Sequence, residues 1–250
     1  MDLGLAGQVF LVTGGSRGLG FATAQELVSE GAKVVLAARD QTALEEAVSA
    51  LGGSKSALGV QIDLKDPTSS SVLVKAAIDA YGRIDGALLS VGGPPGGGIL
   101  EVSDEQWLAA FESTFLGPLR TARGVAKEMV GPGAIAFVLS SSVRAPIPKL
   151  GISNGIRPGL AMAAKTMADE LGPRNIRVFG LLPGRIDTDR TRQLDSSDAN
   201  RRPAAEATIP LRRYGEPAEF GKVAAFLLSP VASYVTGSMI AVDGGSIRSI

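Results

Sequence analysis

A chain of 250 residues, of which 45% are hydrophobic, is long enough to bury one well-packed core, and we expect one domain. Its 25 Lys and Arg residues balance 25 Asp and Glu residues without long blocks of either sign, which argues against nucleic acid and anionic membranes as partners. The chain has no Cys and no His, which excludes disulfides, thiolate chemistry, the commonest metal ligand and the usual general base; we expect no metal site.

No targeting or membrane-spanning signal is found in the sequence. The N-terminal stretch MDLGLAGQVF lacks a basic region followed by a long apolar run. No window reaches the roughly 18 uninterrupted apolar residues of a spanning helix. We therefore expect a soluble, cytoplasmic protein.

Short apolar runs rich in β-branched residues alternate along the whole chain with helical patterns. We expect strands at 8–14, 33–38, 57–63, 84–90, 134–140, 176–184 and 238–244. We expect helices at 19–30, 41–51, 69–81, 104–129, about 159–171 and 217–228. Strands that are apolar on both faces and separated by helices form a parallel sheet covered on both sides. The sequence therefore predicts a doubly wound, seven-stranded α/β domain of the Rossmann type over residues 1–250.

The first strand is followed by TGGSRGLG, with Gly14, Gly18 and Gly20 opening a helix. Glycine permits a tight turn and a close backbone approach to a pyrophosphate, which then lies on the free N–H groups at the start of that helix. A merely structural turn is the alternative. The position between strand and helix at the start of such a sheet favours a dinucleotide site.

The end of the second strand, LAARD, bears on which dinucleotide is bound. An acidic residue there would bind a ribose hydroxyl, but Ala38 is neutral, and Arg39 with Arg17 offers two guanidinium groups suited to a phosphate. Asp40 is expected to cap the following helix. We therefore expect NADP(H) rather than NAD(H), with solvated surface arginines as the alternative.

Two irregular segments are expected to border a substrate pocket. The loop GGPPGGG at 92–98 offers almost no side chains, and the segment at 187–209 is polar and charged, as expected of a lid over a site. A solvated helix-loop insert explains 187–209 equally well.

These motifs, together with Asp63, SVGGPP (90–95), LSSS (139–142), LPGRIDTD (182–189) and YVTGSMIAVDGG (234–245), resemble those of the short-chain dehydrogenase/reductase family, in particular its members similar to 3-oxoacyl-carrier-protein reductases. The likeness covers nearly the whole chain. It implies a cofactor bed made of Gly14, Ser16, Arg17, Gly18, Leu19, Gly20, Arg39, Asp63, Leu64, Ser90, Gly92, Pro183, Gly184, Ile186 and Thr188. It also implies a homotetramer or homodimer formed through the helix at 104–129, the helix after Pro158 and the C-terminal strand.

The resemblance also implies a catalytic set of Asn, Ser, Tyr and Lys. Ser140 falls on the family's serine, whereas Thr114, Ser153 and Arg157 fall where the family has Asn, Tyr and Lys. The substitution is chemically severe, because the hydroxyl of serine is a far poorer acid than a phenol with a pKa of about 10, and arginine stays protonated and does not relay protons.

Pro158 is expected to start a helix and to displace Arg157 from helical geometry, since proline disfavours the helical conformation in the residue before it. The three tyrosines, Tyr81, Tyr214 and Tyr234, lie at ordinary structural positions of the family and are expected to pack rather than to replace the lost acid.

Three functions remain open from the sequence. The first is an NADP(H)-dependent oxidoreductase acting on a small carbonyl or alcohol, in which a water held by Ser140, Ser153 and Asn154 delivers the proton. The second is a catalytically silent NADP(H)-binding homologue acting as a sensor or as a subunit of an assembly. The third is elimination or hydration in the same pocket without net redox change.

Overall fold

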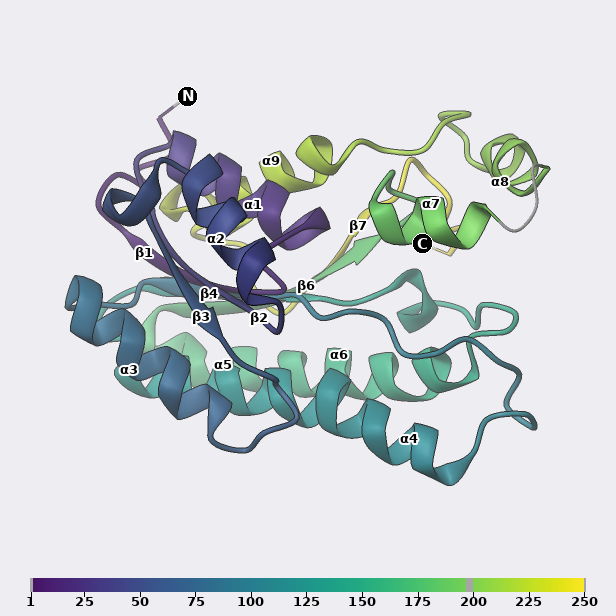
Figure 1. Ribbon diagram of the computed structural model, residues 1–250, viewed down its shortest axis with the longest axis horizontal. Helices are drawn as coiled ribbons and strands as arrows, with labels where there is room; N and C mark the ends of the chain where they lie inside the picture. Colours follow the sequence, from purple (N-terminus) through teal and green to yellow (C-terminus); the bar gives the residue numbers. More distant parts are fainter. Residues whose placement is uncertain (1, 197–199, 250) are drawn as a thin grey trace.

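In the computed structural model, which describes residues 2–196 and 200–249, seven strands form one parallel sheet in the order β3-β2-β1-β4-β5-β6-β7 (Figure 1). The strands are β1 (Val9–Thr13), β2 (Lys33–Ala38), β3 (Ala57–Gln61), β4 (Gly86–Leu89), β5 (Gly133–Val138), β6 (Ile176–Pro183) and β7 (Met239–Val242). Each expected strand is present. The doubly wound α/β fold predicted from the sequence is therefore confirmed.

Helices cover both faces of this sheet. Helices α1 (Gly18–Ser29), α2 (Gln41–Ala50) and α9 (Pro217–Leu228) lie on one face, and α3 (Ser69–Tyr81), α5 (Gly117–Glu128) and α6 (Gly151–Leu171) lie on the other (Figure 1). Neighbouring residues of one strand point to opposite layers, so that Phe10 packs in the core on the α1 side and Leu11 in the core on the α6 side. This alternation explains why the strands read as continuous apolar runs.

The helix expected at 104–129 is divided into two. Helix α4 (Asp104–Phe111) passes into a π-helical segment, Glu112–Leu116, before α5 begins at Gly117. Pro118 at the start of α5 has no N–H to donate to the carbonyl of Thr114, and its ring crowds the preceding turn. The wider π turn accommodates that ring, and single π turns inside helices are frequently found at functional sites.

The expectation that a helix begins near Pro158 is wrong. Helix α6 begins at Gly151 and contains Pro158 in its interior. A proline inside a helix costs about 3 kcal/mol, but the preceding turn is anchored by Asn154, whose side chain bonds to both the N–H and the carbonyl of Ile147, at 3.0 and 2.9 Å. Burial of Ile152 and Ile156 in the same turns offsets the cost.

Two helices occupy the segment 187–209. They are α7 (Asp189–Asp195), whose N-terminus is capped by the side chain of Thr188, and α8 (Arg201–Thr208). Positions 197–199 of this segment lie outside the described residues. Asp187 accepts hydrogen bonds from Arg192 at 2.9 Å and from Arg202 at 3.0 Å, which fastens both helices to the chain that leaves β6.

A buried arginine on β6 closes the end of helix α9. Arg177 is 8% exposed and donates hydrogen bonds to the carbonyls of Leu227, Leu228 and Ser229, at 2.6, 3.2 and 2.8 Å. The last carbonyls of a helix have no partner within the helix and carry its negative dipole end, which favours a cation there. Burial lowers the pKa of Arg177 to about 10, so it stays charged at neutral pH.

We expect Arg177→Met to lower the free energy of unfolding by about 3 kcal/mol, because it leaves several buried carbonyls without a donor. The measurement is urea unfolding followed by circular dichroism. Lys222→Met, on the exposed side of α9, is the matched control and should change stability by less than about 0.5 kcal/mol. Equal stability of the two variants would contradict this role of Arg177.

Candidate active site

The candidate site lies at the carboxyl ends of the strands, where the strand order reverses between β1 and β4. The two strands are tied together at this point, because the hydroxyl of Thr13 donates to the carbonyl of Ser90 at 2.8 Å. Connections from β1 and β4 leave toward opposite faces of the sheet, so a crevice opens between them.

The turn after β1 places its backbone in close contact with the backbone at the end of β4. Gly14 has a φ of +58°, and a Cβ atom built on it would lie 2.7 Å from the carbonyl oxygen of Ser90. A Cβ on Gly20 would meet the carbonyl oxygen of Gly14. Arg17 is the N-cap residue of α1 but makes no side-chain cap hydrogen bond within the described residues. The first N–H groups of α1 therefore face the crevice without a side-chain acceptor, which is the arrangement that binds phosphate.

Both arginines named from the sequence lie at the edge of this turn. Arg17 forms an exposed ion pair with Asp40 at 3.3 Å, and the other carboxylate oxygen of Asp40 accepts from the N–H of Ala43, which confirms Asp40 as the cap of α2. Arg39 is exposed, and its guanidinium has no hydrogen bond or ion pair among the described residues. It is free to bind an added anion.

The remaining cofactor candidates line the ends of neighbouring strands. Thr188 approaches the glycine turn, since a Cβ on Gly18 would lie 3.7 Å from its methyl carbon. Ser90 is buried under the turn. The carboxylate of Asp63 accepts a hydrogen bond from the N–H of Lys65 at 3.0 Å. The others lie along the same rim: Ser16 and Leu19 at the start of α1, Leu64 against α5, Gly92 after β4, and Pro183, Gly184 and Ile186 at the end of β6.

Three serines at the end of β5 form a hydrogen-bonded serine chain, in which the backbone N–H and the hydroxyl of Ser142 link Ser140 to Ser153. The hydroxyl of Ser140 accepts from the N–H of Ser142 at 3.1 Å, and the hydroxyls of Ser142 and Ser153 lie 3.2 Å apart. Ser142 and Ser153 are both buried. The sequence named Ser140 and Ser153 but missed Ser142, although the run LSSS placed three hydroxyls at the end of a strand.

Asn154 and Thr114, which were also expected at this site from the sequence, do not bond to the serine chain among the described residues. Both ends of the Asn154 side-chain amide are held by Ile147, and among the described residues Asn154 makes no side-chain hydrogen bond to the serines, so the proposed shared water has no support here. Thr114 is 1% exposed in the π-helical segment and bonds to Ser113 at 3.5 Å, not to the serine chain.

The tyrosines are engaged elsewhere. Tyr214 donates to Asp195 at 2.9 Å, and burial and that carboxylate raise the pKa of its phenol. Tyr81 lies under Lys33, whose ammonium is 5.1 Å from the ring centre, and Tyr234 is fully exposed. Among the described residues no phenol, carboxylate or thiol is hydrogen-bonded to the serine chain.

Arg157 lies one helical turn after Ser153 on the same face of α6, and Pro158 does not displace it from the helix. It is 4% exposed and donates to the carbonyl of Val138 at 2.5 Å. Its Nε atom is buried without a partner among the described residues. Burial, and secondarily the charge of Arg190, lower the pKa of Arg157 to about 10. It therefore remains a cation at neutral pH.

Arg190 is a site residue that the sequence did not single out. It projects from α7 and donates to the carbonyls of Gly93 and Pro94 in the loop after β4, at 2.9 and 3.3 Å. A Cβ on Gly93 would lie 2.5 Å from its guanidinium, so only glycine leaves room for this contact. Burial lowers the pKa of Arg190. The contact joins positions 97 residues apart, and no local pattern predicts it.

Comparison with known proteins decides the family. Residues 14–246 match the model of the family described as Enoyl-(Acyl carrier protein) reductase. The chain is 35% identical to human "Dehydrogenase/reductase SDR family member 4", over 97% of this chain and 88% of that protein. The chain belongs to the short-chain dehydrogenase/reductase family. The resemblance inferred from the motifs is thereby confirmed, and the protein is an oxidoreductase of this type.

Other members of the short-chain dehydrogenase/reductase family match over nearly their full length. The 3-oxoacyl-(acyl-carrier-protein) reductase FabG of Vibrio cholerae serotype O1 is 30% identical over 97% of this chain and 98% of its own. The crystal structure of L-sorbose reductase from Gluconobacter frateurii, complexed with NADPH and L-sorbose, superposes with a TM-score of 0.93 at 31% identity and covers 100% of both chains.

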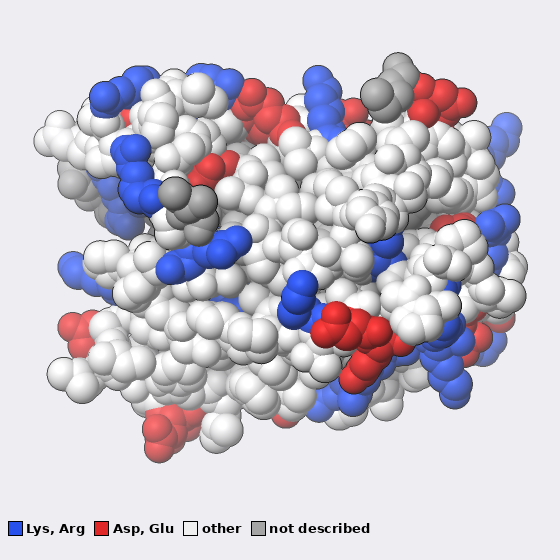
Figure 2. All heavy atoms as spheres, turned by 180° about the vertical axis from the view of Figure 1, so that it is seen from behind, with Lys and Arg blue, Asp and Glu red and all other residues white. Residues whose placement is uncertain are grey.

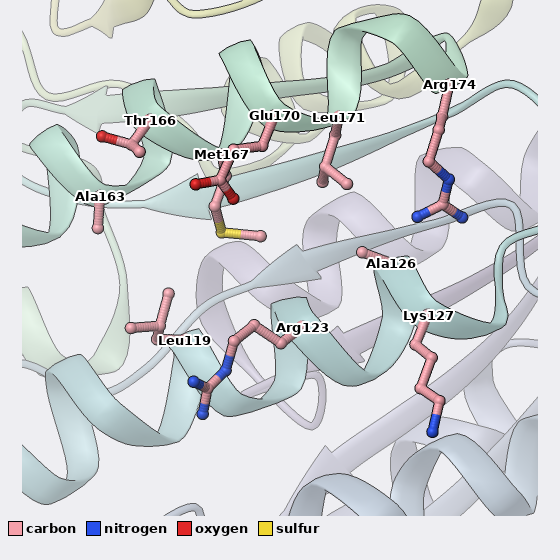
Figure 3. Close-up of a pocket in the computed structure, with 10 residues that line it drawn as sticks. All are labelled: Leu119, Arg123, Ala126, Lys127, Ala163, Thr166, Met167, Glu170, Leu171 and Arg174. Atoms are coloured by element: carbon pink, nitrogen blue, oxygen red, sulfur yellow. The ribbon is translucent and has the colours of Figure 1, made fainter.

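This family member also has a hollow outside the crevice. It has a volume of about 660 Å³ and lies between α5 and α6, where Leu119 and Met167 point toward one another (Figure 3). None of its lining residues belongs to the predicted site. On the face opposite to that of Figure 1, basic and acidic side chains are interspersed (Figure 2). Within the described residues no helix is long and apolar enough to cross a membrane.

Proposed function

We propose that this protein is an NADP(H)-dependent oxidoreductase that transfers hydride to or from a small carbonyl or alcohol substrate. One observation carries the proposal: a glycine turn pressed onto the end of β4 leaves the N-terminus of α1 open at the point where the strand order reverses. The likeness to L-sorbose reductase complexed with NADPH supports it.

The residues present fit this dinucleotide. The free N–H groups of α1 suit its diphosphate, and the unpartnered guanidinium of Arg39, beside Arg17, suits the additional phosphate that distinguishes NADP(H) from NAD(H). Thr188 and Ser90 would hold the remainder of the cofactor from the two sides of the crevice. When bound, the cofactor supplies the hydride, and the protein supplies orientation and proton transfer.

We propose further that Ser153 and Arg157 stand where the family has Tyr and Lys, and that Thr114 stands where it has Asn. The proton then moves between the hydroxyls of Ser153 and Ser142, since each can both accept and donate, and Ser140 positions Ser142 by accepting from its backbone N–H. A serine is a poor acid, so a relay that passes a proton from water suits this chain better than a single acidic donor. Arg157, which stays charged, can polarise a carbonyl oxygen by hydrogen bonding.

The segment 187–209 acts in this proposal as a lid. Its helix α7 begins beside the glycine turn at Thr188 and reaches the loop after β4 through Arg190. It therefore crosses the mouth of the crevice from β6 to β4. Closure over a bound substrate would exclude water from the hydride transfer.

We propose self-association through α5 and α6. The hollow between these helices has an apolar floor and a rim on which Arg123 and Lys127 of α5 stand opposite Glu170 of α6, with Arg174 after the end of α6 on the side of Glu170 (Figure 3). A rim with both signs of charge is complementary to a copy of itself turned about a two-fold axis. Exposed apolar side chains extend this face, with Met162 at 69% and Phe111 at 40% exposure.

A silent NADP(H)-binding homologue is the second candidate function. It is favoured by one observation, that among the described residues the serine chain has no acidic neighbour. It shares the cofactor site with the first candidate and differs in turnover.

We expect NADPH to bind at least about 10-fold more tightly than NADH, because a charge-assisted hydrogen bond contributes about 1.5–3 kcal/mol. Arg39→Ala should remove most of this preference and leave NADH binding unchanged. The measurement is Trp107 fluorescence or the shift in melting temperature during titration with each dinucleotide. Arg213→Ala, an exposed arginine at a distance from the turn, is the control. Failure of both dinucleotides to bind at millimolar concentration would refute the proposed function.

We expect NADPH oxidation with at least one member of a panel of ketones, aldehydes, quinones and acyl thioesters. Ser140→Ala should reduce kcat by about 10²-fold, the lower end of what positioned proton transfer contributes. Ser71→Ala, exposed on α3, is the control. Absorbance of the cofactor reports hydride transfer. NADPH binding without turnover would favour the silent homologue, and product formed at constant absorbance would indicate elimination or hydration.

We expect the protein to sediment as a dimer or tetramer, and Ala163→Glu, which places a charge in the hollow between α5 and α6, to yield a smaller species. Ala50→Glu, exposed on α2, should leave the assembly intact. Analytical ultracentrifugation at micromolar concentration measures both variants. A monomeric parent protein would contradict the proposed interface.

A further inference from the structure

A buried guanidinium, that of Arg157, and a more exposed one, that of Arg190, lie at the substrate end of the crevice, and neither forms an ion pair with a carboxylate among the described residues. Arg157 is held at the end of β5 by the carbonyl of Val138, and Arg190 is held after β4 by the carbonyls of Gly93 and Pro94. Strands β4 and β5 are neighbours in the sheet. The two cations are close enough for the charge of Arg190 to lower the pKa of Arg157.

No acidic side chain neutralises this pair. The chain has no Asp or Glu between Met129 and Ala168. The carboxylates flanking Arg190 in sequence are used elsewhere, because Asp187 pairs with Arg192 and Arg202, and Asp189 pairs with Arg192. Within the described residues, neither Arg157 nor Arg190 takes part in an ion pair.

The hydrogen bonds that these arginines do make leave their charge and several donors unused. Carbonyl groups orient a guanidinium but do not neutralise it. Arg157 keeps a buried Nε without an acceptor among the described residues, and a buried donor or charge without a partner is costly. A guanidinium offers five N–H donors in a planar fork that matches the two oxygens of a carboxylate.

The cofactor does not supply the missing anion in the arrangement proposed above. Its diphosphate is assigned to the start of α1, and its additional phosphate to Arg39 and Arg17, at the ends of β1 and β2. The arginine pair lies at the ends of β4 and β5, beside the serine chain. It is therefore available to the substrate.

We propose that the substrate carries a carboxylate, which Arg157 and Arg190 bind while the carbonyl or alcohol of the same molecule reacts. The inference rests on the proposed oxidoreductase function and narrows its substrate class to oxo acids and hydroxy acids. Because Arg190 belongs to α7 and holds the loop after β4, binding of the carboxylate also fastens α7 to that loop.

The test begins with binding, which does not require turnover. Oxamate, an unreactive oxo-acid analogue, and its uncharged counterpart oxamide are titrated by calorimetry onto the protein alone and onto its complex with NADPH. We expect oxamate to bind and oxamide to bind at least about 10-fold more weakly, as charge-assisted bonds predict. Equal binding of the two probes, or binding of neither, would overturn the inference.

Substitutions of Arg190 and Arg157 test whether these two residues bind oxamate. Arg190→Gln should weaken oxamate binding by about 10- to 100-fold, and Arg190→Lys should restore part of it, because lysine keeps the charge but loses the fork. Arg157→Met should also lose oxamate binding yet melt no lower than the parent protein, since it removes an unpaired buried charge. Arg213→Gln is the control. Undiminished oxamate binding in both Arg190→Gln and Arg157→Met would overturn the assignment.

Turnover provides the second arm and separates this inference from the proposed function. Reduction of 2-oxo-4-phenylbutanoate with NADPH is compared with reduction of its methyl ester, and we expect the acid to have the higher kcat/KM by at least about 10-fold. If the ester is reduced as fast as the acid, the substrate carboxylate is refuted, but the proposed oxidoreductase function is not. If the parent protein does not bind NADPH, the proposed oxidoreductase function is refuted. The oxamate titration of the protein alone would still decide whether the carboxylate site exists.

Discussion

The structure depends on a contact between backbones at the centre of the sheet. The turn after β1 lies so close to the end of β4 that a side chain at Gly14 would collide with Ser90, and one at Gly20 would collide with Gly14. This contact fixes where α1 begins and aims its N–H groups into the crevice. The nucleotide end of the site is thus built almost entirely from the main chain, and it needs few identifiable side chains.

Features of this kind can be predicted from the sequence, because they are local. The seven apolar runs, the glycine spacing and the cap at Asp40 each involve residues close together in the chain, and the structure places all of them as expected. The start of α6 could not be predicted, since the anchoring of Asn154 and the burial of Ile156 override the preference of Pro158. The role of Arg190 could not be predicted either, because it depends on a contact with a loop far away in the sequence.

The two ends of the crevice, at β1 and at β5, contribute in opposite ways to the stability of the fold. The end at β1 relies on close packing, which also stabilises the fold, whereas the end at β5 carries the buried charge of Arg157, which opposes folding. Burial, and secondarily the charge of Arg190, lower the pKa of Arg157 from its usual value to about 10, so the unfolded chain holds this proton more tightly. Below a pH of about 10 the buried charge therefore costs the fold about 3 kcal/mol. Buried charges that destabilise the fold are concentrated at functional sites, which supports a functional role for Arg157.

Helix α7 is held at its two ends by different parts of the molecule. Near its start, Arg190 grips the loop after β4, and at its last residue Asp195 accepts from Tyr214, a buried side chain that also lies beneath Arg202. The grip on the loop consists of hydrogen bonds to two carbonyls, while the anchor at Tyr214 includes a ring packed in the interior. If the bonds from Arg190 to Gly93 and Pro94 are released, α7 loses its contact with the loop after β4, while Asp187 and Tyr214 still hold it on the side of β6.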